Sequence, residues 1–97
     1  RQSDRYELTL DLIATALGRL ALAGAGAPVP ALTDAEADMA RRLAPGPAEA
    51  RLWADLAARL AERTAHARAV NLDPAQVILD TLLQIDATAA EARTRAA

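Results

Sequence analysis

Few residues of this chain have types and spacings that could carry chemistry, and His66 is the first of them. It is the single histidine, and Glu62 precedes it by one helical turn, so the two side chains could share a metal ion. The sequence has no cysteine to complete a ligand set. A solvent-facing imidazole near the end of a helix is the better interpretation of His66, and we expect no metal and no cofactor.

Other catalytic signatures are missing from the sequence. Gly24 and Gly26 form a Gly-x-Gly pair, but neither a strand-to-helix unit nor a lysine follows it, which excludes a phosphate-cradling loop. No nucleophile stands beside a plausible base, and no paired carboxylates lie in an apolar setting. We therefore expect that this chain by itself is not an enzyme.

Charged residues between positions 51 and 66 form a regular pattern instead. They recur at intervals of three and four and alternate in sign, so they share one face of a helix. Such a stripe is typical of a solvated helix face, and the alternative is the polar rim of a subunit contact. The stripe comprises Arg51, Asp55, Arg59, Glu62 and His66, and the candidate interface residues are Arg51, Asp55, Arg59, Glu62 and Arg63.

Composition limits the fold class. The 97 residues include 27 Ala and 15 Leu but one Trp, one Tyr and no Phe, a composition that favours helices over strands. The length is that of one domain, residues 1–97, with a small core. Because the chain starts with Arg1 rather than Met, we expect it to be a fragment of a longer protein. We predict an all-α fold, a small helical bundle of about four helices.

The charge balance limits the class of partner. The chain has 11 arginines against 13 acidic residues and a net charge of -2, the wrong sign for a domain that grips phosphates. No apolar run approaches the ~20 residues of a membrane span, and no signal peptide is visible. We expect neither direct nucleic-acid binding nor membrane insertion, and a cytoplasmic location.

Capping residues and helix breakers divide the chain into four predicted helices. The first covers about residues 3–23 and ends at the Gly/Pro-rich segment 24–30. Thr33 and Glu36 form a capping box that opens a short helix to about residue 43, with Leu32, Met39 and Leu43 as its inward contacts. The third helix covers about residues 47–69. The fourth begins at residue 74 and ends between residues 85 and 91, after which the tail 92–97 frays.

The fourth helix has a strong start signal. Asp73 offers a side-chain oxygen to the first-turn amides, Pro74 suits the first helical position, and Gln76 can reach back. Thr33 and Asp73 are therefore the predicted structural caps. We interpret Trp53 as a core residue rather than an interface anchor. Helical spacing predicts one core shared by Leu10, Ile13, Leu17, Leu56, Leu60, Ile78, Leu82 and Ile85.

Two segments resemble a bacterial replication family. Residues 4–13 (DRYELTLDLI) are similar to the opening helix of the C-terminal domain of the DNA polymerase III delta-prime subunit in its alphaproteobacterial form. The segment from Leu52 and Trp53 through Asn71-Leu72-Asp73 to residues 82–83 is similar to its closing helix pair. The family commonly carries basic residues just after that Asp, whereas Pro74 and Ala75 follow here.

This resemblance implies an assembly role. The family belongs to the clamp loader of the DNA polymerase III holoenzyme, whose C-terminal domains form a helical collar that holds five subunits together. ATP hydrolysis and clamp contact belong to N-terminal modules, so this chain would scaffold assembly through the collar domains of other clamp-loader subunits. Two alternatives stay open, namely the collar of another clamp-loader subunit and a helical regulatory or interaction domain of an unrelated enzyme.

Overall fold

The computed structural model describes residues 2–96, which form four helices and contain no strand. The helices are α1 (Gln2–Gly24), α2 (Asp34–Leu43), α3 (Pro47–Val70) and α4 (Pro74–Ala96). The Cα atoms extend over 38 × 28 × 17 Å, so the domain is flat, about two helices thick. The predicted all-α fold class is confirmed.

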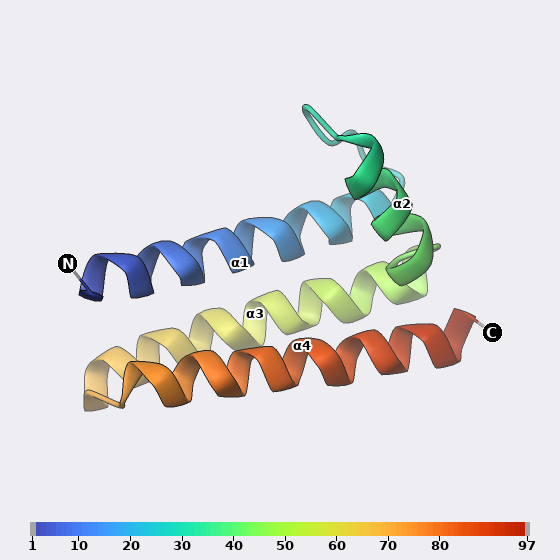
Figure 1. Cartoon of the computed structure of the whole chain (residues 1–97). Coiled ribbons are helices and arrows are strands. Elements are labelled where there is room, and N and C mark those ends of the chain that lie inside the picture. Colours follow the sequence, from blue (N-terminus) through green and yellow to red (C-terminus); the bar gives the residue numbers. More distant parts are fainter. Residues whose placement is uncertain (1, 97) are drawn as a thin grey trace.

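Three long helices lie side by side and the short α2 crosses one end of them (Figure 1). α1 and α4 run in the same direction, and α3 runs back between them in the opposite direction. Most contacts between the long helices join α3 to α1 and α3 to α4. α3 is therefore the central element, and α1 and α4 each keep a side that no other helix of this chain covers.

The helix starts follow the local signals in the sequence. The predicted capping box of α2 is present, because Glu36 N donates to Thr33 Oγ1 at 3.1 Å and Thr33 N donates to Glu36 Oε1 at 3.4 Å. Asn71 ends α3 in the left-handed conformation with φ 56°. Asp73 stands directly before α4 and its carbonyl accepts from Val77 N at 3.2 Å. Within residues 2–96, however, no first-turn amide donates to the Asp73 carboxylate.

The core is centred on α3. Trp53 is 1% exposed and Leu56 is fully buried, and the Trp53 Nε1–H donates to the Leu43 carbonyl at 2.8 Å. The interpretation of Trp53 as a core residue is confirmed. Of the eight residues predicted to share the core, Leu10, Leu17, Leu56 and Leu60 are buried, Ile13 and Ile85 pack against the core, and Ile78 is half-buried.

The prediction was wrong for Leu82, whose residue surface is 52% exposed. The inward face of α4 combines Ile85 with small and threonine residues, which include Thr81, Thr88 and Ala92. Each buried hydroxyl donates to a carbonyl one turn back, Thr81 Oγ1 to Val77 O at 2.8 Å and Thr88 Oγ1 to Gln84 O at 2.9 Å. Because both hydroxyls are hydrogen-bonded, their burial leaves no polar group without a partner. The small side chains of this face let α4 pack closely against α3.

The predicted end of α4 was also wrong, since the helix continues to Ala96. Ala92 is fully buried in the core cluster, and Arg95 pairs with Glu91 across one turn at 3.2 Å. Both contacts favour a helix in the segment predicted to fray. Ala97 lies outside the described residues.

The inward contacts predicted for α2 need a correction. Leu43 packs against the core, but Leu32 and Met39 are exposed. The buried residue of α2 is Ala40, because a small side chain lets this short helix lie close to the end of α1.

No helix within residues 2–96 is both long and apolar enough to cross a bilayer.

Candidate interaction surface

An apolar groove between α1 and α4 is the main candidate site. It is an open hollow of about 450 Å³ lined by Arg5, Tyr6, Thr9, Pro74, Ala75, Ile78, Leu79 and Leu82. The groove exists because α1 and α4 both pack on α3 and only slightly on each other. Burial raises the pKa of the Tyr6 phenol at this groove, and the neighbouring Glu7 raises it further.

Leucines gather along the α4 wall of this groove. Leu79, Leu82 and Leu83 are 58%, 52% and 60% exposed. On α1, the exposed Leu12 follows Thr9 by three positions and so extends the other wall. An exposed cluster of large apolar side chains on a small domain marks an interaction surface. Leu82, which we predicted to lie in the core, belongs to this exposed cluster.

Two charged residues lie in line with these leucines. Arg5 precedes Thr9 by one turn on α1, and Asp86 follows Leu82 by one turn on α4. Both residues are exposed, and within residues 2–96 neither forms an ion pair. Arg5 lines the groove, and Asp86 lies one turn beyond its last lining residue on α4, at a different position along the helix axes.

The charged stripe predicted on α3 is present as a solvent-facing surface. All five candidate interface residues are exposed, namely Arg51, Asp55, Arg59, Glu62 and Arg63. Arg63 Nη1 reaches across to α4 and pairs with Asp80 Oδ2 at 2.8 Å. The other four form no ion pair within the described residues. The stripe lies on the side of α3 away from Trp53 and Leu56, and its role as a polar rim stays a prediction.

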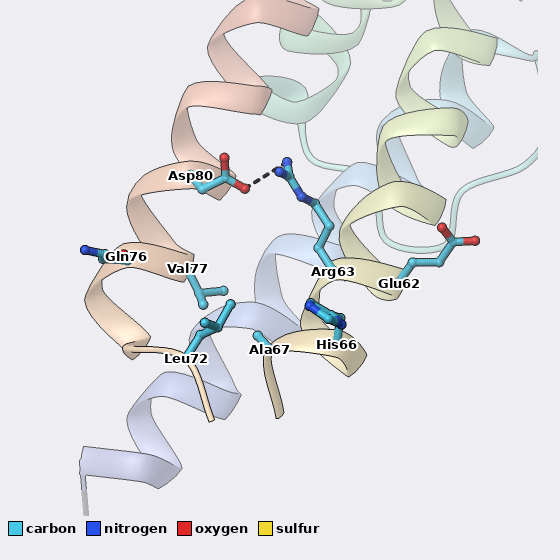
Figure 2. A pocket seen from close by; sticks show the side chains of 8 residues that line it. All are labelled: Glu62, Arg63, His66, Ala67, Leu72, Gln76, Val77 and Asp80. Carbon is cyan, nitrogen blue, oxygen red and sulfur yellow. Dashed lines mark ion pairs between the residues drawn. The ribbon is translucent and has the colours of Figure 1, made fainter. Parts of the chain in front are cut away.

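A second hollow lies where α3 meets α4 and contains His66. It has a volume of about 450 Å³ and is lined by Glu62, Arg63, His66, Ala67, Leu72, Gln76, Val77 and Asp80. Figure 2 shows the Arg63–Asp80 pair across this hollow and the Glu62 carboxylate directed away from the His66 ring. The structure therefore does not bring Glu62 and His66 together as metal ligands, and within residues 2–96 no group of three or more potential ligands exists.

Two ion pairs hold distant parts of the chain together. Arg19 Nε and Nη2 donate to Glu36 at 2.8 and 3.0 Å, and Arg19 Nη1 donates to the Pro30 carbonyl at 2.9 Å, which fixes the loop 25–33 against α1. Arg68 on α3 likewise donates to Glu7 on α1. The hydrogen bond from Arg19 is the largest cause of a lowered pKa at Glu36. The hydrogen bond from Arg68 does the same for the pKa of Glu7.

These features describe a domain with a small satisfied core, a charged α3 face and an uncovered apolar groove. Buried side-chain nitrogen and oxygen atoms of the described residues all have hydrogen-bond partners, so no orphaned polar group points to a ligand. The uncovered apolar groove is therefore the candidate site for contact with another protein. Comparisons with protein-family models, with curated proteins and with solved structures gave no match.

Proposed function

We propose that this chain is an assembly domain, the C-terminal collar domain of a DNA polymerase III delta-prime subunit, which packs on collar domains of other clamp-loader subunits. The observation that carries the assembly role is the exposed leucine cluster along the α1–α4 groove. The specific family rests on the resemblance of residues 4–13 and of the segment around Trp53 and Asn71-Leu72-Asp73.

The geometry supports a helical partner. The groove is bordered by two helices that run in the same direction, so a helix laid between them would complete a four-helix arrangement. Leu79 and Leu82 would be the apolar anchors of that contact. The exposed charges of α3, with Arg59 and Arg63 among them, would lie outside this apolar centre, as expected for a polar rim.

Co-purification with the collar domains of other clamp-loader subunits tests this proposal. We expect a complex with and without ATP, because the contact is static and no ATP site takes part. Leu82→Glu should abolish the complex, whereas Leu22→Glu should leave it intact, since Leu22 is exposed but lines a different hollow between α1 and α3.

Several outcomes would contradict the proposal. A complex that requires ATP would contradict the static contact, and no complex under either condition would favour an interaction domain of an unrelated enzyme.

Titration against primer-template DNA at several salt concentrations is a second check. We expect negligible binding at physiological salt because of the net charge of -2. Submicromolar, salt-sensitive binding would overturn the scaffold role.

A further inference from the structure

The charges of the α1–α4 groove fit a second copy of this chain. We propose that two copies pair face to face and antiparallel through the groove, about a two-fold axis that crosses the helices near Leu82. The proposal uses the same groove as the proposed function but does not depend on the clamp-loader assignment. The second copy would occupy the surface until a heteromeric partner displaces it.

The positions of Arg5 and Asp86 select the antiparallel orientation. Arg5 lies beside Ala75 and Ile78, near the end where α1 and α4 begin, and Asp86 lies one turn beyond Leu82 in the direction of both helices. A two-fold axis near Leu82 reverses the helix direction of the second copy. It therefore brings Arg5 of one copy to the height of Asp86 of the other, and symmetry repeats this pair.

The parallel orientation has the opposite effect. It would place the two Arg5 side chains at one height and the two Asp86 side chains at another, so like charges would oppose each other across the interface. Neither residue has an ion-pair partner within the described residues of its own copy, so both are free to pair. Antiparallel packing of the long helices also opposes their dipoles.

The apolar residues are self-complementary in this orientation. α4 lies over α4 of the second copy, so Leu79, Leu82 and Leu83 meet the same residues of the partner near the axis. These leucines are more than half exposed in the single chain, and they become the buried centre of a four-helix layer. Leu12 extends the contact along α1.

The available area suits a reversible dimer. With the axis near Leu82, residues 74–90 of α4 face the same segment of the second copy, so ~25 Å of each helix overlaps at 1.5 Å per residue. Two helices of ~10 Å diameter then present a face on the order of 500 Å². Standard interfaces bury about 800 Å² per partner, and weaker, transient ones bury less.

Sedimentation analysis across a concentration series tests the proposal. We expect a reversible dimer, which Leu82→Glu and, independently, Leu79→Glu convert to a monomer with unchanged circular dichroism. Arg5→Glu or Asp86→Arg alone should raise the dimer dissociation constant by roughly tenfold, because each change turns two attractive pairs into repulsive ones. The double variant should restore dimerisation. Arg42→Glu, on the exposed surface of α2, and Leu22→Glu are the matched controls that keep the wild-type constant.

Other results would overturn the pairing. A chain that stays monomeric at high micromolar concentration contradicts it, and so does a dimer that neither leucine variant weakens. A double charge variant no better than the single variants would exclude the antiparallel register. A monomer that still binds clamp-loader collar domains would refute this inference alone, whereas a dimer that binds none of them would refute the proposed function alone. If both occupants bind, the collar partner should dissociate the dimer.

Discussion

Gly24→Ala is expected to destabilise the domain although alanine is the better helix former. Gly24 is the last residue of α1, where this helix meets α2 and the start of α3. A Cβ atom added here would lie 2.8 Å from Ala44 Cβ, 2.9 Å from the Ala44 carbonyl oxygen and 3.0 Å from Ala50 Cβ. Optimal carbon–carbon contacts are about 3.5–4.0 Å, so all three neighbours are too close.

The expected magnitude follows from what can move. Ala44 and Ala50 are 4% and 5% exposed, and the contacts involve backbone and Cβ atoms rather than flexible side-chain ends. Overpacking of this kind costs about 1–3 kcal/mol, while the helix-propensity gain at a helix end is below ~1 kcal/mol. The net loss should be about 1–2 kcal/mol, which lowers the melting temperature by roughly 4–15 °C in a domain of this size.

Gly18→Ala is the matched control. Gly18 lies inside α1 and has no heavy atom within 4 Å of an added Cβ. The same substitution should therefore stabilise the domain by about 0.5–1 kcal/mol. Urea and thermal unfolding followed by circular dichroism, at one fixed protein concentration, measure both changes. Fixed concentration is needed because association contributes to apparent stability.

The two glycine substitutions are expected to change the free energy of unfolding in opposite directions. A Gly24→Ala variant at least as stable as the wild type would show that α1 does not approach Ala44 and Ala50 this closely. Equal destabilisation by the two glycine substitutions would show that the atoms packed around each glycine do not determine the change in stability. Ala44→Gly in the Gly24→Ala background removes one of the three contacts and should recover part of the lost stability.

Two further predictions concern the core and the ion pairs. Leu56→Ala should lower the free energy of unfolding by about 2–5 kcal/mol, because Leu56 is fully buried. Leu82→Ala should lower that of the monomer by less than ~0.5 kcal/mol, because Leu82 is exposed. Similar losses in a urea titration would mean that the inward face of α4 is misassigned. Acid should weaken the fold, because hydrogen bonds from Arg19 and Arg68 lower the pKa of Glu36 and Glu7 from 4.5. Carboxylates with a lowered folded-state pKa stabilise the fold above their unfolded pKa and lose this effect as the pH falls through the folded value. The Glu7→Gln/Glu36→Gln variant should therefore lose less stability than the wild type as the pH falls below about 4.5, and equal losses would show that these pairs do not stabilise the fold.

Local signals were sufficient for the starts of the helices, although not for the end of α4. Thr33 and Glu36 marked the start of α2, Pro47 the start of α3, and the spacing around Trp53 its buried side. Each of these signals acts within one or two turns of the residue concerned. The sequence therefore predicts where helices lie with little knowledge of their neighbours.

The side of α4 that packs inward depends on its neighbours, and the sequence predicted it only in part: Ile85 packs against the core, whereas Leu82 is exposed. Hydrophobic periodicity placed Leu82 on the buried side together with Ile78 and Ile85. The observed inward row contains Thr81, Thr88 and Ala92, which suit a close approach to α3. The Glu7–Arg68 pair joins residues 61 positions apart and has no local signature in the sequence. The candidate groove was missed for the same reason.

Small interior residues and exposed leucines have one common cause. Gly24, Ala44, Ala50 and Ala92 let the helices approach closely, so the interior has little room for large side chains. The leucines displaced from that interior then lie on the outer sides of α1 and α4. Such a domain folds around Trp53 and the leucines next to it, while its outer leucines add little to folding and are available for association. Substitutions inside should therefore change stability first, and substitutions in the α1–α4 groove should change assembly first.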